Sequence, residues 1–297
     1  MIAGRPCPVS RLLSPQSDNT TRMEEHYYEK PNEYLTLRGD AAAGHLGMGR
    51  AHTPATDLLG SGQVKLQTGV EFTTLRPTVV DYGSYTKFEN RYTTTVGVGI
   101  GHDMQVDFSF AAVMSSQNLE PSGIAGHRGV GSPAVSISYK LPTTCIPHLE
   151  LLAGIGVVFE SDGQLRANAG DSTDISPLLA ASYRLVRGYT PYVSYRAHLR
   201  AQNWADNSQE VAIGVEKELN AGVSVGCKGT LLFEPWTSVT TASQDASVEL
   251  HALVALGKNI SVVPLVAALQ QSRRTVGEYK QQPIAGITSG ISLFFYF

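Results

Sequence analysis

Apolar and polar residues alternate along most of the chain from about residue 63 onwards. In residues 91–101, RYTTTVGVGIG, one row of positions holds Tyr, Thr, Val, Val and Ile, and the other holds Arg, two Thr and three Gly. Successive side chains of a strand point to opposite faces, so this period of two predicts strands with one apolar and one polar face. The same alternation recurs in residues 104–114, 135–141 and 192–200.

Twelve segments of this kind divide the chain. We place the strands at residues 64–76, 85–100, 104–114, 134–141, 149–160, 176–186, 191–201, 210–219, 223–234, 246–256, 260–269 and 284–297. Their connections alternate in length, with short turns such as 101–103 and 220–222 and longer loops such as 115–133 and 161–175. Alternating lengths put all short turns at one end of an antiparallel series, as in membrane-spanning barrels. The pattern therefore predicts an all-β, transmembrane, up-and-down antiparallel β-barrel of about 12 strands, over residues 61–297.

Two features indicate that the apolar rows face lipid. The polar rows are rich in Gly, Ser, Thr and Ala instead of the dense Lys and Glu of a soluble surface. Aromatic residues gather near the predicted strand ends, as in the girdles of membrane barrels: Phe108, Phe110, Tyr139, Tyr183, Tyr189, Tyr192, Tyr195, Phe233, Trp236 and the final FFYF. The closing segment GISLFFYF also looks like the carboxyl-terminal strand that the outer-membrane assembly machinery reads.

The first 60 residues show no sustained period and predict an irregular tail, either periplasmic or folded back as a plug of the lumen. Residues 1–20 lack the apolar core of an export signal. Because a barrel of this type must be exported, we expect either that a leader is missing from this sequence or that export follows another route.

Composition narrows the function classes. The chain is 16% charged with a formal net charge of -3, which gives no electrostatic basis for nucleic-acid binding. It has no run approaching the roughly 20 apolar residues of a spanning helix. Cys7, Cys145 and Cys227 lie far apart without metal or disulfide spacing. We expect no cofactor and no metal.

The polar rows supply the candidate residues of the lumen. On the predicted alternation, these residues would line the path of a solute: Lys87, Glu89, Arg91, Asp107, Lys140, Glu150, Arg184, Arg196, His198, Arg200, Glu216, Lys228 and Glu249. Acidic and basic groups nearly balance, which favours no dedicated anion or cation filter. Arg184, Arg196 and Arg200 form the one local imbalance, on neighbouring strands. A barrel of this size could be filled by such side chains or hold an open pore, since roughly eight strands fill and sixteen leave a channel.

Two features of the sequence bear on a catalytic function. GVGIGHD, residues 97–103, has the glycines of a dinucleotide fingerprint but is followed by a strand instead of the helix that the fingerprint needs. His198 and His251 are the strand-borne histidines, and Ser194 lies four residues from His198. This spacing does not make a Ser-His-Asp arrangement on one strand, so we predict lumen histidines and no enzyme.

Three segments suggest a family. DLLGSGQVKLQTGVEFT (57–73), VGVGIGHDMQVDFSF (96–110) and GVGSPAVSISYKL (129–141) resemble outer-membrane proteins of the meta-pathway phenol-degradation transporter family. The resemblance implies an outer-membrane channel for passive passage of small solutes, aromatic or hydrophobic ones among them, with the lipid bilayer as partner. Two alternatives remain open: a structural or adhesive barrel with a filled lumen and functional external loops, and a barrel-borne lipid hydrolase.

Overall fold

The computed structural model describes residues 58–79, 83–84, 86–119, 123–130, 133–143, 146–159, 173–185, 187–200, 207–220, 222–234, 242–276 and 279–297. Side chains are described for all of these except 78–79, 83–84, 117–119, 123–130, 200, 274–276 and 279–281. Within this part, no helix is long and apolar enough to cross a bilayer. The first 57 residues of the predicted tail lie outside the described residues, so its division from the barrel stays a prediction.

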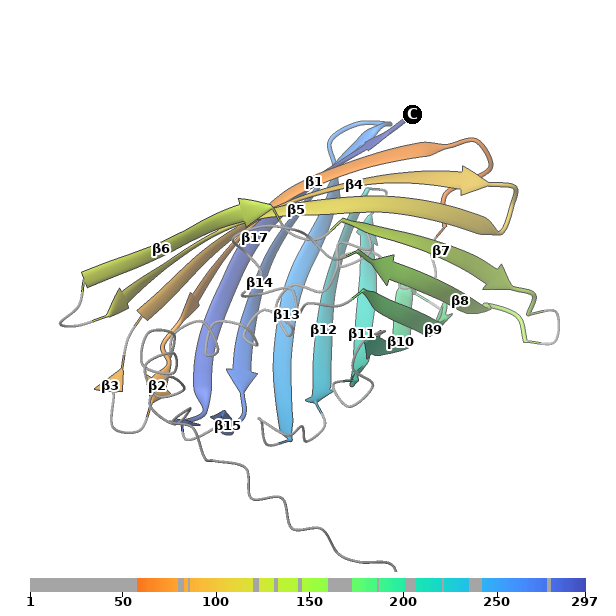
Figure 1. Ribbon diagram of the computed structural model, residues 1–297. Helices are drawn as coiled ribbons and strands as arrows, with labels where there is room; N and C mark the ends of the chain where they lie inside the picture. The colour runs from red at the N-terminus through yellow and green to blue at the C-terminus, as the bar shows by residue number, and fades with distance from the viewer. Residues whose placement is uncertain are drawn as a thin grey trace, which may run out of the picture.

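Twelve antiparallel strands close into one barrel, as the sequence predicts (Figure 1). The ring closes because β4 pairs with β5 on one side and with β1 on the other, while β1 pairs with β17. The barrel strands are β1 (Val64–Leu75), β4 (Thr86–Ile100), β5 (Met104–Leu119), β7 (Ala134–Leu141), β8 (Leu149–Val158), β9 (Asp174–Tyr183), β10 (Tyr189–Arg200), β11 (Ser208–Asn220), β12 (Val223–Glu234), β13 (Ser243–Ala255), β14 (Ile260–Gln271) and β17 (Ile284–Tyr296).

The segment 115–133 is more ordered than the predicted loop. β5 continues to Leu119, and a further strand, β6 (Gly123–Val130), pairs with its second half. β7 pairs with the first half of the same strand, so β6 and β7 are two pieces of one position in the sheet. Pro133, which has no backbone N–H to donate to a ladder, stands immediately before β7. Alternation did not predict β6 because GIAGHRGV has no two-faced pattern.

The predicted loops 77–84 and 270–283 also carry short strands. β2 (Thr78–Val79), β3 (Gly83–Ser84), β15 (Arg274–Val276) and β16 (Tyr279–Gln281) form a separate four-stranded sheet. It lies at the long-loop end, away from the carboxyl terminus in Figure 1. At the opposite end the turns are short, and Gly101 and Gly222 take positive φ values of 65° and 105° in two of them. A glycine there avoids the strain that a Cβ would bring.

The apolar rows point outward. Phe108 and Phe110 are 52% and 54% exposed, Ile213 is 64% exposed, and Lys87 on an inward row is 3% exposed. A water-soluble barrel would reverse these values. The fold is therefore a membrane barrel whose outer rows meet hydrocarbon, and the predicted fold class is confirmed.

Two predicted girdle rings face inward instead. Tyr192 is 7% exposed and Phe294 is 1% exposed, because each sits one position out of phase with the outward rows of β10 and β17. The outward neighbours Tyr195 and Phe297 are 41% and 72% exposed. Trp236 lies outside the described residues. The girdle prediction is thus wrong for Tyr192, and the closing FFYF divides its rings between the two faces.

A proline marks one seam of the barrel. The pairing of β13 with β14 runs from Ala246 and Gln270 to His251 and Leu265, and resumes at Val254 and Val262. Pro264 falls in the interval between these stretches. Because proline cannot donate to a ladder, the backbone connection between β13 and β14 is weakest here.

The outward rows predict the environment of Cys227, a free thiol on β12. In a Cys7→Ser, Cys145→Ser variant, a nitroxide spin label on Cys227 should collide readily with oxygen dissolved in the bilayer and rarely with a water-soluble nickel complex. Electron paramagnetic resonance saturation measures both. The same label at an inward position, on Ser261→Cys with Cys227→Ser added to the background, should lack the high oxygen accessibility. Equal oxygen accessibility at the two sites would contradict the assignment of the faces.

Candidate functional site

The inward rows of the strands form the candidate site. Most candidate residues lie on them. Lys87, Glu89, Asp107, His198, Glu216 and Glu249 are buried, and Arg91, Lys140, Glu150, Arg196 and Lys228 are half-buried. The alternation of the strands therefore brings these residues into one lumen.

Three charges stand in a row on β4. Lys87, Glu89 and Arg91 are two residues apart, so they share the inward face. Glu89 forms an ion pair on each side, with 3.1 Å from its Oε2 to Nζ of Lys87 and 3.4 Å from its Oε1 to Nη2 of Arg91. The carboxylate offsets part of the repulsion between the two cations.

A second cluster joins three strands on another part of the wall. Lys228 of β12 lies 3.0 Å from Glu249 of β13, measured from Nζ to Oε2. The ring of His251 sits between two carboxylates, with its Nδ1 3.0 Å from Glu249 Oε1 and its Nε2 hydrogen-bonded to Glu216 of β11. Gly226 on β12 makes room for this contact, because a Cβ there would meet His251 and Glu216 at about 2.5 Å.

Glu71 of β1 connects the two clusters. Its carboxylate interacts electrostatically with Arg91 and Glu89 on one side and with Lys228 and Glu249 on the other. Its side chain crosses Gly290 of β17, where an added Cβ would lie 3.0 Å from the Cγ of Glu71. These charged residues form a belt across the lumen, which we call the charged belt: Glu71, Lys87, Glu89, Arg91, Glu216, Lys228, Glu249 and His251.

Tyr192 fills the lumen beside the belt. Its ring lies over Gly214 of β11, where a Cβ would come within 2.3 Å of the ring. Tyr192 and Gly214 are directly paired in the ladder, so the large side chain of one strand occupies the space left by its neighbour. The alternation of residues 192–200 puts Tyr192 in phase with Ser194 and Arg196, but its ring was assigned to the outer girdle.

Towards the short-turn end, the chain before β1 enters the lumen. Leu59 is 8% exposed, and its backbone N–H donates to Oε1 of Gln105 at 3.0 Å. Gln105 in turn donates to Asp107 at 2.6 Å, and Lys65 lies 3.9 Å from Asp107. The carbonyl of Gly60 lies so near Gly99 that an added Cβ would be 2.1 Å from it. Gly99 therefore permits this segment to lie against the wall.

Leu58 contacts an apolar cluster inside the barrel. The cluster consists of Leu152 of β8 with Leu178 and Ala180 of β9, which are 0%, 7% and 7% exposed. These residues share the inward rows with Glu150 and Ser182. This apolar cluster, on an otherwise polar wall, would hold Leu58 in place. The alternation pattern did not predict the cluster.

Two of the three predicted arginines, Arg184 and Arg196, lie apart. Arg196 lies on the inward row of β10 opposite Leu178, whereas Arg184 is exposed beyond the end of β9. The six residues from position 178 to 184 amount to roughly 20 Å of strand. The side chain of Arg200 lies outside the described part. Arg184 thus lies one residue beyond β9 and is not among the buried residues of the inward row.

His198 has partners on both neighbouring strands. Its Nδ1 is 3.2 Å from Oγ of Ser176 on β9, and its Nε2 is 3.9 Å from Oε2 of Glu210 on β11. Ser176, His198 and Glu210 are the residue types of a hydrolase triad. Ser176 is 0% exposed, however, and the histidine–carboxylate distance exceeds a hydrogen bond. Sequence spacing missed this row because its members come from three strands.

One stripe of the lumen is apolar throughout. Val263, Leu265, Ala267 and Leu269 follow one another on the inward row of β14, and each is at most 8% exposed. At the long-loop end Leu269 packs with Leu75 of β1 and Ile284 of β17. The apolar stripe comprises Val263, Leu265, Ala267, Leu269, Leu75 and Ile284. Alternation could not place it, because β14 is apolar on both faces.

Among the residues that the structure describes, no group of His, Cys, Asp and Glu side chains has the arrangement of a metal site. What the lumen offers chemically is a belt of paired charges beside an apolar path that runs along one strand.

Comparisons with known proteins give the fold. No family model matches the chain, and no curated protein matches its sequence. Among solved structures, an outer membrane channel from Pseudomonas putida F1 matches 82% of this chain and 98% of its own, at 10% identity and a TM-score of 0.62. The NanC porin (13% identity, 76% of this chain, 98% of its own) and the CymD monoaromatic hydrocarbon channel (10%, 80% and 89%) have TM-scores of 0.48 and 0.46.

The first of these likenesses extends over nearly the whole of the other protein. At 10% identity, this likeness shows the fold of the chain and does not indicate which solute the chain would pass. The resemblance inferred from the sequence is confirmed at this level: the chain shares the fold of an outer-membrane channel.

Removal of the shared carboxylate on β4 should weaken the barrel. In Glu89→Gln, the buried Lys87 and the half-buried Arg91 lose the carboxylate between them, and breaking a buried pair in this way costs about 3 kcal/mol. Urea unfolding of the barrel in lipid vesicles measures the change.

Glu150→Gln is the matched control. Glu150 pairs with Lys140 at 2.8 Å, but the two side chains are 28% and 34% exposed. Breaking this exposed pair should lower the free energy of unfolding by less than about 1 kcal/mol. Equal effects at Glu89 and Glu150 would show that the charged belt does not stabilise the barrel.

Proposed function

We propose that the protein is an outer-membrane channel for passive passage of small apolar solutes, aromatic molecules among them. The apolar stripe carries this proposal. It runs from Val263 to Leu269 on β14 and ends at Leu75 and Ile284, so it extends over most of the length of one strand. A purely polar lumen would give an apolar molecule no surface on which to lose its contact with water.

The charged belt also supports this function. Its pairs and the ring of Tyr192 lie inside the lumen, which suits a narrow passage better than a wide aqueous pore. Small, weakly hydrated molecules would follow the stripe, while hydrated ions would meet paired charges that offer no net attraction. The candidate residues of the belt and of the inward rows are proposed as the polar boundary of this path.

The segment before β1 is proposed as a plug that narrows the short-turn mouth. Support comes from Leu58 and Leu59, which lie inside the barrel against the apolar cluster and Gln105. This favours the lumen over the periplasm for the part of the tail nearest β1. Such a plug would give a gated passage in place of a leaky one.

A barrel with a filled lumen and a structural or adhesive role is the second candidate. The buried ion pairs and the 1% exposure of Phe294 favour it. A hydrolase has the weaker support of the Ser176–His198 contact, and it predicts that a fluorophosphonate would label Ser176. As further partners we propose the lipid bilayer and, through β17, the outer-membrane assembly machinery.

The passage of solutes can be tested in Gram-negative cells whose lipopolysaccharide excludes apolar probes. Cells that produce the full chain should take up the fluorescent probe 1-N-phenylnaphthylamine faster than cells without it. Leu265→Gln places an amide on the stripe and should slow this uptake about tenfold, since the change removes roughly one buried apolar side chain from the path.

Val113→Gln is the matched control, since Val113 is buried on the inward row of β5 and outside the stripe. It should leave uptake within about twofold of the parent. Uptake no faster than in cells without the protein, together with no ion conductance in planar bilayers, would favour the filled barrel.

A further inference from the structure

Lys217 stands out on the lipid-facing surface. Among the side chains that the structure describes on the outward rows of the twelve strands, it is the one that carries a charge. The residue before it, Glu216, points inward to His251, which fixes Lys217 on the outer row of β11. A cation facing hydrocarbon is unfavourable unless it reaches the headgroup region or a partner. Its place on this strand therefore calls for an explanation.

Lys217 lies close to the short-turn rim. β11 ends at Asn220, so Lys217 is roughly 10 Å from the rim along the strand. Its Nζ is 4.0 Å from the centre of the Tyr189 ring and donates to the backbone carbonyl of Arg187. These contacts hold the ammonium group under the turn between β9 and β10. Arg184 and Arg187 in that turn are exposed.

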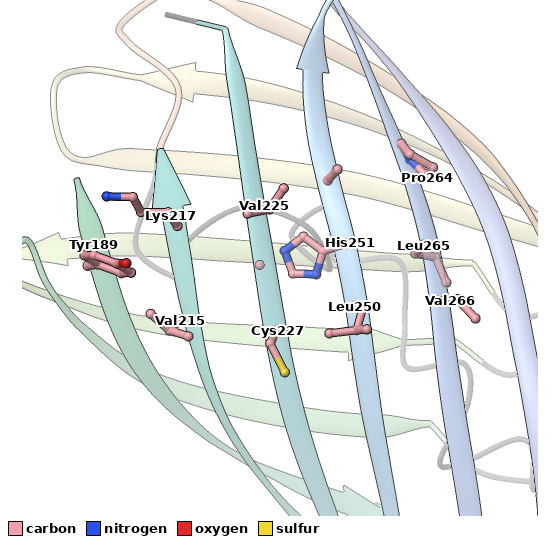
Figure 2. Close-up of a pocket in the computed structure, with 12 residues that line it drawn as sticks. Tyr189, Val215, Lys217, Val225, Cys227, Leu250, His251, Pro264, Leu265 and Val266 are labelled. Atoms are coloured by element: carbon pink, nitrogen blue, oxygen red, sulfur yellow. The ribbon is translucent and has the colours of Figure 1, made fainter. Parts of the chain in front are cut away.

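A recess opens in the outer wall beside Lys217 (Figure 2). It has a volume of 630 Å³ and extends across β10 to β14. Most of its lining belongs to outward rows and is apolar: Val215, Val225, Cys227, Leu250, Ala252, Pro264 and Val266. In the ladders, Cys227 lies between Val215 and Leu250, and Ala252 lies beside Val225, so small side chains alternate with larger ones here. It begins near Lys217 and continues towards the middle of the membrane.

We propose that this recess binds one anionic phospholipid of the leaflet at the short-turn end. An acyl chain occupies the apolar recess, and the phosphate lies against Lys217 at its upper edge, with Arg184 and Arg187 adding positive charge at the rim. The recess alone would accept any acyl chain. The charge at its edge selects the headgroup, because a lysine near the surface attracts anionic lipid.

The geometry places both parts at the right depth. Val225 and Ala252 lie two or three residues from the short-turn ends of β12 and β13, and Pro264 lies four residues from that of β14. A chain in the recess thus starts below the headgroup level and runs along the outer wall past Pro264. The site depends on the barrel spanning a membrane and does not depend on the proposed passage of solutes.

Native mass spectrometry of the full chain tests the site. The protein is taken from nanodiscs containing equal amounts of phosphatidylglycerol and phosphatidylcholine, and the lipid that stays bound is counted. One phosphatidylglycerol molecule should remain in preference to phosphatidylcholine. Lys217→Gln keeps a donor for the Arg187 carbonyl but removes the charge, and should reduce the retained phosphatidylglycerol about five-fold. Ala252→Leu, which fills the recess, should reduce retention of the lipid whatever its headgroup.

Lys258→Gln is the control, since Lys258 is an exposed cation in a turn at the same rim. It should leave retention unchanged. The heat-modifiable mobility of each variant on gels shows that the barrel is folded. Equal retention of the two lipids, or an unchanged ratio in folded Lys217→Gln, would overturn the proposal. A variant that loses probe uptake but keeps the bound lipid would count against the proposed channel function and leave the lipid site standing.

Discussion

The structure rests on one constraint: in hydrocarbon, every backbone N–H and C=O of the wall needs a partner within the wall. Twelve ladders meet this demand only when the ring closes, which it does where β1 pairs with β17 and β4 with β5. Closure then fixes the direction of each side chain, because alternate residues must face lipid or lumen. The distribution of charge, the lumen and the outer recess all follow from that division.

The division is strict for charge and loose for apolar residues. Charged side chains of the described strands face inward apart from Lys217, whereas Leu, Val and Phe occupy both faces. The asymmetry is physical, since a charge in hydrocarbon is costly but an apolar group in the lumen needs only another apolar group beside it. The lumen can therefore hold the charged belt and the apolar stripe side by side.

The sequence predicted the twelve strands, the connectivity and the outward rows because a two-sided environment leaves a period of two. It failed where that period is absent. β14 is apolar in both phases, so its lumen row could not be recognised, and β6 has no apolar row to detect. Tyr192 was misplaced because an aromatic ring near a strand end suits the girdle as well as the lumen. Contacts between strands, such as Ser176 with His198, depend on register, which alternation does not give.

The pairing of Tyr192 with Gly214 bears on how such a tube changes during evolution. The ring fits because its neighbour has no side chain, and Gly226 plays the same part for His251 and Glu216. The bore at this depth is thus set by complementary volumes on adjacent strands. A larger residue at position 214 would need a smaller one at 192, so the bore can change at this depth only when paired residues exchange volume.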